Sequence, residues 1–171
     1  MLPIPACLLP KRWRSPAQRL CCNPALRPLC IRVSELSPDW RRVRITLPLA
    51  GRNLNPGGSM FGGAIAALAD PIAALACARV VDGCAVWTRA MTVDFRREGR
   101  SDLELRFDFD PTLESEIRGE LQRRGRATPT FEYAFYDTQD RLCALVRNTV
   151  AIRPADYQPD DLRKTIDEEA P

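Results

Sequence analysis

The sequence has 171 residues, of which 45% are apolar and 27% charged, with a formal net charge of +3 and no histidine. Its length and apolar content suit one globular domain with tails. Without histidine there is no Ser-His or Cys-His pair, no imidazole metal ligand and no histidine general base, so acid-base chemistry falls to carboxylates, hydroxyls or lysine.

The first 28 residues form a Pro-rich, basic extension. Prolines at six positions leave room only for a short helix around residues 17–22. Lys11, Arg12 and Arg14 interrupt the apolar stretch that a signal peptide requires, and we expect no run long enough for a membrane span. We therefore predict a cytoplasmic protein.

Two antiparallel strands are predicted next, over residues 29–36 and 40–49. Their sequences, "LCIRVSEL" and "WRRVRITLPL", alternate apolar and polar residues on either side of a short "SPD" turn. Alternating arginines are typical of the solvent face of a strand. A basic arm that contacts nucleic acid is the alternative, and we expect no nucleic-acid partner.

A long apolar helix is predicted from about residue 61 to 81. It is rich in Ala, Leu and Ile around nearly its whole circumference, so we expect a central helix that is buried on most sides. The segments that follow are predicted as strands at 84–95 and 102–110, a charged helix at about 112–124, and strands at 128–137 and 141–153.

These elements predict an α+β fold. An antiparallel sheet needs cover on one face, and the 61–81 helix is the element apolar enough to provide it, so the sheet is expected to wrap the helix. We predict a single domain over residues 29–154 and an acidic, flexible tail over 155–171. Seven cysteines, an odd number without a C-x-x-C pair, favour neither a disulfide framework nor a zinc site.

The stretch "NLNPGGSMFGGAIAALADP", at residues 53–71, is unusual for a buried segment. The amides of Gly62 and Gly63 at the predicted helix start can face an oxygen that carries negative charge, although close helix packing also explains the glycines. Asp70 is a carboxylate in an apolar run, and Pro71 after it removes a helical N–H. Asp70 and Pro71 together indicate either a functional site or a kink in a packed helix.

Asp70 and Gly62 cannot serve the same substrate atom within one chain. Their separation along a helix is roughly 12 Å, at about 1.5 Å per residue. If two such helices lie antiparallel across a twofold axis, the N-terminus of one faces the middle of the other. We therefore predict a site at the interface of a homodimer.

Asn55, the Gly62-Gly63 pair and "ALADP" resemble the hot-dog-fold acyl-CoA thioesterases related to the phenylacetyl-CoA and 4-hydroxybenzoyl-CoA enzymes. The resemblance extends from about residue 30 to 153, and is strongest to an uncharacterised branch that shares the "ADP" and a later "VW...VDF". It implies a hot-dog fold, in which an antiparallel sheet of five or six strands wraps a long central helix. Homodimers, or tetramers of two dimers, are then expected.

The resemblance also implies catalytic roles. The Gly62 amide would polarise a thioester carbonyl, Asn55 would help to place substrate or water, and Asp70 of the partner chain would act as general base or nucleophile. Thr88, on the next strand, would hold the water. The substrate would be an acyl-CoA or a similar acyl thioester, with coenzyme A as part of the substrate and no separate cofactor or metal.

Further residues are expected to contact the substrate. Gly63 and Phe61 flank the Gly62 amide, and these enzymes usually have histidine where this chain has Phe61. Four arginines around the strand that follows are candidates for the phosphates of coenzyme A, with a solvated surface as the alternative. They are Arg89, Arg96, Arg97 and Arg100.

Other functions remain open at this stage. A non-catalytic hot-dog protein that binds acyl-CoA, a fatty acid or another apolar ligand accounts for Phe61. A structural dimer without a ligand is a further alternative. A hot-dog dehydratase is disfavoured, since the chemistry of those families pairs a histidine with the carboxylate.

Overall fold

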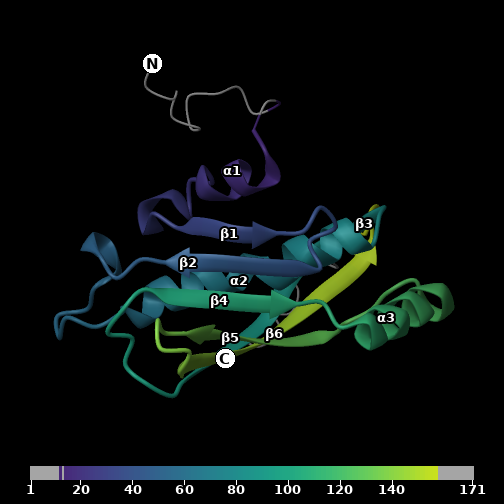
Figure 1. Ribbon diagram of the computed structural model, residues 1–171. Coiled ribbons are helices and arrows are strands. Elements are labelled where there is room, and N and C mark those ends of the chain that lie inside the picture. Colours follow the sequence, from purple (N-terminus) through teal and green to yellow (C-terminus); the bar gives the residue numbers. More distant parts are fainter. Residues whose placement is uncertain (1–11, 13, 158–171) are drawn as a thin grey trace, which may run out of the picture.

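The computed structural model describes residues 12 and 14–157 (Figure 1). Most of the predicted extension before residue 14 and the tail beyond residue 157 lie outside the described residues. The elements are α1 (Pro16–Cys21), the short 3-10 helix η3 (Arg27–Leu29), β1 (Arg32–Leu36), β2 (Arg42–Leu47), the 3-10 helix η4 (Gly51–Asn53), α2 (Gly62–Val80), β3 (Cys84–Phe95), β4 (Leu103–Asp108), α3 (Pro111–Arg124), β5 (Thr130–Tyr136) and β6 (Leu142–Pro154).

The six strands form one antiparallel sheet in the order β1-β2-β4-β5-β6-β3. Every strand and helix expected from the sequence is present, with ends that differ by a few residues. β3 pairs with β6 along its whole length, from Cys84 opposite Pro154 to Phe95 opposite Ala144, with a bulge between Thr88 and Ala90. Among the residues that the structure describes, no strand pairs with the other side of β3, so β3 is a long edge of the sheet.

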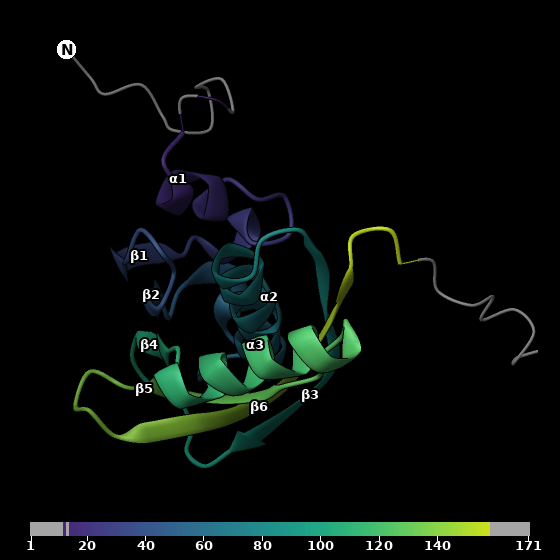
Figure 2. The same cartoon turned by 90° about the vertical axis from the view of Figure 1, so that its right-hand side faces the viewer.

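The sheet curves around α2 (Figure 2). Residues on the inner face of the sheet, such as Phe107, Phe135 and Ile45, are fully buried together with Leu68 and Ile72 of α2. A curved antiparallel sheet that wraps one long helix is the hot-dog fold, so the predicted fold class is confirmed.

α2 is less enclosed than the sequence suggested. A stripe that includes Gly63, Ala67, Asp70, Leu75 and Ala78 is exposed in the single chain. We expected no apolar run long enough for a membrane span, but by length and composition α2 is long and apolar enough to be one. The core helix of a soluble protein meets the same requirement. The exposed stripe is the only part of α2 without a packing partner in the described residues.

The segment before β1 packs onto the domain. α1, expected as a short helix, begins with a capping box in which Ser15 and Gln18 satisfy each other's backbone amides. Leu20, Leu26 and Leu29 from this segment are buried in the main core. The domain boundary at residue 29 stays a prediction, but these leucines show that the fold also uses residues before it.

α3 lies across the end of the sheet where α2 finishes (Figure 2). Its Arg118 donates to the carbonyl of Val80, the last residue of α2, at 2.8 Å. Its Glu114 accepts three hydrogen bonds from Arg41, at 2.7, 2.8 and 3.0 Å. These contacts fix the C-terminal end of the central helix.

Candidate functional site

The N-terminus of α2 presents free backbone amides. The loop before the helix is fixed by hydrogen bonds from Phe61 N to the carbonyl of Asn53 at 2.7 Å and from Met60 N to the carbonyl of Gly99 at 2.8 Å. Phe61 is the N-cap residue, and no side chain caps the helix. Within the described part of the chain, the amides of Gly62 and Gly63 have no acceptor. They are available to an oxygen of a ligand.

Two aromatic rings lie against these glycines. A Cβ at Gly63 would lie 2.3 Å from Cε1 of Phe61, and a Cβ at Gly62 would lie 3.0 Å from Cζ of Phe95. Both rings are half exposed, Phe61 at 50% and Phe95 at 55%. The absence of a side chain at both glycines therefore leaves space for the rings. The amides of Gly62 and Gly63 lie between the apolar side chains of Phe61 and Phe95.

Asn55 uses its side chain within the loop that leads to α2. Its Nδ2 donates to Ser59 Oγ at 2.8 Å, and its Oδ1 accepts from Ser59 N at 3.1 Å. These bonds close the turn over residues 55–59. The predicted role of Asn55 towards the substrate stays a prediction, and the structure shows that it shapes the loop.

Asp70 lies in a different part of the surface, half-way along α2. Its carboxylate is exposed and forms no ion pair or hydrogen bond within the described residues. Together with Thr88 it lines a cavity of about 400 Å³, whose other walls include Pro71, Leu75 and Trp87. The structure thus brings Asp70 and Thr88 together, and leaves Gly62 of the same chain at the helix end.

The backbone at Asp70 is held by three strands of the sheet. Thr88 Oγ1 of β3 donates to the Asp70 carbonyl at 2.9 Å, and Asn148 Nδ2 of β6 donates to the same carbonyl at 3.0 Å. Tyr133 of β5 donates to the Ala69 carbonyl at 2.7 Å, and its hydroxyl accepts from Asn148 at 3.0 Å. We call Thr88, Tyr133 and Asn148 the carbonyl clamp.

The clamp holds the carbonyls of the two residues that precede Pro71, in the middle of α2. Pro71 has no N–H to donate, so the helix loses one bond of its own at this point. Side-chain donors from the sheet reach the carbonyls on the preceding turn and fix the chain there. Burial raises the pKa of Tyr133, so its hydroxyl remains a donor. Thr88 uses its hydroxyl hydrogen in the hydrogen bond to the Asp70 carbonyl, and its hydroxyl oxygen can still accept a hydrogen bond.

Sequence reasoning missed Tyr133 and Asn148. Both occupy inward positions of strands whose other inward residues are apolar, and both are buried. The signal that could have identified them is a polar side chain at a position of a strand where the alternating pattern calls for an apolar one. Its meaning depended on the helix that lies opposite.

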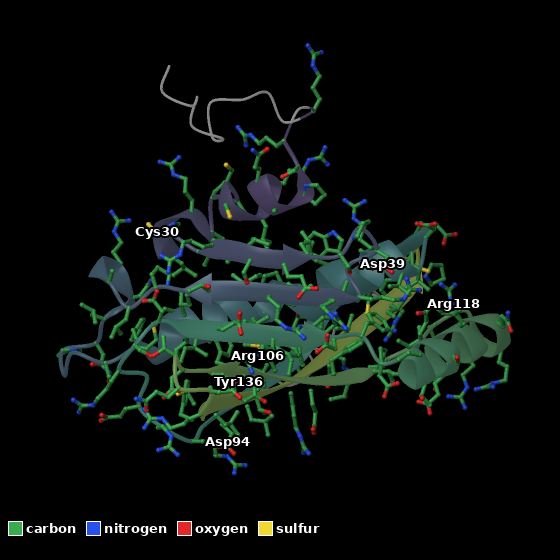
Figure 3. The ribbon with its side chains drawn as sticks, in the orientation of Figure 1. Cys30, Asp39, Asp94, Arg106, Arg118 and Tyr136 are labelled. Carbon is green, nitrogen blue, oxygen red and sulfur yellow. The ribbon has the colours of Figure 1, made fainter. Side chains whose placement is uncertain are left out.

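The four predicted arginines are exposed. Arg96 pairs with Asp94, near the end of β3 (Figure 3), and Arg100 pairs with Glu98 at 2.7 Å. Arg89 is the extra residue of the β3 bulge. Arg96 and Arg97 directly follow Phe95, whose ring contacts Gly62, so they lie towards the N-terminus of α2 rather than towards Asp70. Their role towards coenzyme A stays a prediction.

No metal centre is built from the described residues, in which no three His, Cys, Asp or Glu side chains lie together as ligands would. The described chemistry is instead a set of free amides at one end of α2 and a carboxylate on its exposed stripe. These two parts are separated within one chain.

Comparison with known proteins agrees with the fold. Residues 18–152 match the family described as a domain of unknown function, DUF4442. A search of curated proteins finds no match.

Solved structures give closer detail. A protein of unknown function from Pseudomonas aeruginosa, described as a probable thioesterase, is 26% identical, with a TM-score of 0.67 over 75% of this chain and 85% of that chain. A thioesterase from Haemophilus influenzae is 20% identical, with a TM-score of 0.63 over 83% of this chain and 91% of that chain. A mutant of a thioesterase from Staphylococcus aureus is 19% identical, with a TM-score of 0.59 over 75% of this chain and 98% of that chain.

Proposed function

The chain belongs to the DUF4442 family, and from this membership, its hot-dog fold and the geometry of α2 we propose that it is an acyl-CoA thioesterase. The similarity to a probable thioesterase at 26% identity supports this reaction class. The observation that carries the proposal is that α2 presents two unpartnered groups at separate places. These are the free amides of Gly62 and Gly63, and the carboxylate of Asp70, which has no partner within the described residues.

The proposed site forms between two copies of the chain. β3 is a 12-residue edge strand without a partner on its outer side, and Trp87 and Phe95 on it are exposed. Unpaired edges of this length are usually covered in native proteins. Pairing of two β3 edges about a twofold axis would cover the exposed stripe of α2 and bring Asp70 of one chain towards Gly62 of its partner.

The proposed reaction is hydrolysis of the thioester by water. The Gly62 amide donates to the carbonyl oxygen, on which negative charge develops. Asp70 of the partner subunit accepts a proton from water while the water oxygen bonds to the carbonyl carbon. The C–S bond then breaks, the thiolate takes up a proton, and a carboxylic acid and a thiol leave. In the alternative route Asp70 attacks the carbonyl itself, the C–S bond breaks and the thiolate leaves and takes up a proton, and water then hydrolyses the resulting anhydride to release the carboxylic acid and restore Asp70.

Two variants and two controls test the two roles by following thiol release from acyl-CoA substrates. Asp70→Asn is expected to lower kcat by about 10²- to 10⁴-fold, the usual value of a positioned base. Gly62→Pro removes the N–H at the first helical position, where proline fits, and should cost about 10²- to 10³-fold. Gly62→Ala keeps the N–H and adds the same Cβ, so it is the matched control. Asp82→Asn, just after α2, controls for loss of a carboxylate.

Mixing experiments test whether the site is shared. When the inactive Asp70→Asn and Gly62→Pro proteins are mixed and allowed to exchange subunits, half of the dimers are mixed and each contains one intact site. Activity should therefore return to about a quarter of the wild-type rate. Mixtures as inactive as their components would contradict a site made from both chains, and full activity of Asp70→Asn would contradict the proposed chemistry.

One observation favours a second function, the binding of an apolar ligand without turnover. Phe61 and Phe95 flank the amides where a catalytic site would hold polar groups, and both rings are half exposed. Tight binding of acyl-CoA or fatty acids, measured by calorimetry, without release of thiol from short, long or aromatic acyl chains would establish this function instead.

A further inference from the structure

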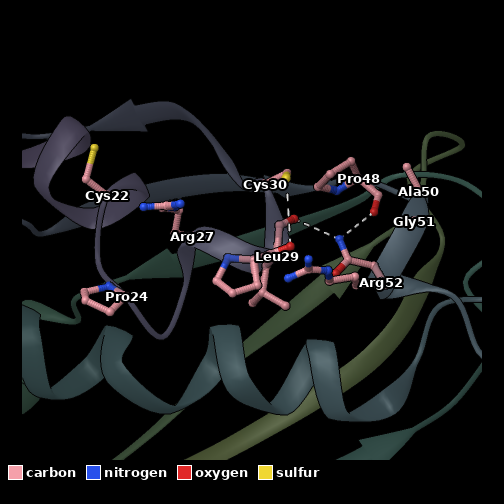
Figure 4. Close-up of a pocket in the computed structure, with 11 residues that line it drawn as sticks. Cys22, Pro24, Arg27, Leu29, Cys30, Pro48, Ala50, Gly51 and Arg52 are labelled. Atoms are coloured by element: carbon pink, nitrogen blue, oxygen red, sulfur yellow. Dashed lines mark hydrogen bonds between the residues drawn. The ribbon is translucent and has the colours of Figure 1, made fainter. Parts of the chain in front are cut away.

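A cavity lined only by residues far from Asp70 lies between the segment before β1 and the loop that leads to α2 (Figure 4). Its volume is about 650 Å³, within the range of small-molecule sites. One wall includes Cys22, Arg27 and Leu29, and the other includes Pro48 and Arg52.

The walls of this cavity are fixed to each other by Asn53. This side chain is 2% exposed, and its Nδ2 donates to the Leu29 carbonyl at 2.8 Å and to the Pro48 carbonyl at 2.9 Å. Its Oδ1 is buried and has no donor within the described residues. The two walls are therefore held together before a ligand arrives, through both amide hydrogens of Asn53.

The cavity is positively charged. Arg27 and Arg52 reach it from opposite walls, and neither pairs with a carboxylate within the described residues. No acidic residue lines it, and the sequence contains none before Glu35. A neighbouring cavity of about 390 Å³ shares Cys22 and Pro24 with it, and its lining adds the arginines Arg12, Arg14 and Arg19.

We propose that this cavity binds a phosphorylated group of a nucleotide-sized ligand. Two guanidinium groups on opposite sides of a fixed cavity match the oxygens of a phosphate or pyrophosphate, to which arginine donates planar pairs of hydrogen bonds. Two of the four candidate arginines near β3, Arg96 and Arg100, are less suited because they are paired with carboxylates.

The cavity is linked directly to the start of α2. The carbonyl of Asn53 accepts from Phe61 N at 2.7 Å, and Phe61 precedes Gly62. If the proposed thioesterase function holds, the phosphorylated end of the acyl carrier can occupy the cavity while its thioester lies at Gly62. A separate phosphorylated ligand that acts on the same loop has the same chemistry, and the experiment below distinguishes the two sources.

Binding is measured directly by calorimetry, with adenosine 3′,5′-bisphosphate and inorganic pyrophosphate as probes. The wild-type protein should bind the nucleotide, and Arg27→Gln and Arg52→Gln should each weaken binding by about 10- to 100-fold. Arg123→Gln and Arg124→Gln, at the end of α3, remove the same charge elsewhere and should leave binding unchanged. Absence of binding to the wild-type protein, or equal loss in the α3 controls, would overturn the proposal.

The thiol of Cys30 gives an independent measurement. Cys30 lines the cavity and is exposed (Figures 3 and 4), so the nucleotide should slow its alkylation by maleimide at least threefold, as located by mass spectrometry. This slowing should disappear in Arg27→Gln. Alkylation of Cys30 at the same rate with and without saturating nucleotide would place the ligand elsewhere and reject the cavity.

Kinetics then identify the source of the phosphate. If the carrier end of the substrate binds here, Arg52→Gln raises KM for acyl-CoA about 10-fold, leaves kcat unchanged, and does not affect a thioester of N-acetylcysteamine, which lacks phosphate. If a separate ligand binds, KM for acyl-CoA stays the same. Asp70→Asn should keep full nucleotide binding, so failure of the thioesterase proposal and failure of this one give different results.

Discussion

At the scale of single residues, Asp70 is positioned through its backbone. Its carboxylate has no partner in the described residues, but its carbonyl accepts from Thr88 and Asn148, and the neighbouring carbonyl of Ala69 accepts from Tyr133. A charged side chain on a helix normally keeps rotational freedom and moves with the helix. Here three strands fix the backbone of the turn that carries it, so the position of Asp70 depends on the buried side chains of Tyr133 and Asn148 as well as on Thr88.

Removal of one member of the clamp should reveal this dependence. Tyr133→Phe deletes the donor to Ala69 and an acceptor of Asn148, so we expect the free energy of unfolding to fall by about 1–2 kcal/mol. Denaturant titration measures it. Tyr136→Phe is the control on the same strand, since its ring keeps the contact with Arg106 at 4.5 Å (Figure 3). Equal stability of Tyr133→Phe and wild type would mean that the clamp contributes nothing.

The burial of Cys77 predicts how the stability of the protein changes at alkaline pH. Burial raises the pKa of its thiol to about 12, against 9.0 in the unfolded chain. The folded state therefore resists ionisation, and the stabilisation that the neutral thiol contributes is complete below pH 9 and lost as pH rises towards 12.

The comparison with Cys77→Ala isolates this effect. The stability difference between wild type and variant should be constant from pH 7 to 9 and shrink by up to about 1.4 kcal/mol per pH unit above it. Urea titrations between pH 7 and 11 provide the measurement, with Cys30→Ala as the exposed control. A difference that stays constant to pH 11 would show that Cys77 ionises as freely in the folded state as in the unfolded chain.

At the scale of elements, α2 combines two functions that conflict. It is the main core helix, and it also carries a proline inside its length and a carboxylate on its exposed stripe. Proline inside a helix costs about 3 kcal/mol relative to alanine. The sheet offsets part of that cost through the clamp, which suits a turn that must keep one shape.

Pro71→Ala tests whether this shape serves activity. The variant restores the N–H that α2 lacks, so its melting temperature should equal or exceed that of the wild type. Thiol release from acyl-CoA should nevertheless fall about tenfold, because a straighter helix moves Asp70 relative to the partner's Gly62. Ala74→Gly, one turn later, weakens the helix without changing Pro71. A variant that gains stability and keeps full activity would show that the proline has no part in the reaction.

At the scale of the whole molecule, the proposed site needs a second copy of the chain. The long edge of β3 and the exposed stripe of α2 lie next to each other, and both present apolar side chains to solvent. The free amides and Asp70 lie at two separate places on this surface. Under the proposed function, one copy of the chain would supply both halves of the site without joining them.

Ala67→Arg tests the assembly as a whole. Ala67 is exposed on the stripe of α2, so the substitution should leave the fold of the monomer intact and prevent two such helices from approaching. Analytical ultracentrifugation should show a dimer for the wild type and a monomer for the variant, with loss of thioester hydrolysis. Gln122→Arg, exposed on α3, is the control that should remain dimeric and active. A fully active monomer would contradict the shared site.

Much of the fold follows from local patterns. Alternation in "RITLPL" and "FEYAFY" predicted strands because one face of each is buried, and the apolar run after Phe61 predicted a core helix. The site was less accessible. Asn55, Gly62 and Asp70 carried a recognisable spacing, whereas Tyr133 and Asn148 looked like isolated polar residues and Arg27 like part of a charged extension.

The sequence by itself determined the class of the fold, the order of its elements and the oddity of a lone carboxylate before a proline, because hydrophobic period and backbone chemistry are local properties. The tertiary structure decided which donors hold Asp70 and that the segment around Leu20 and Leu26 joins the core. It also decided that Arg27 and Arg52 line the same cavity. These contacts join residues far apart in the chain. Their partners are set by how the sheet curves around α2, which no local pattern specifies.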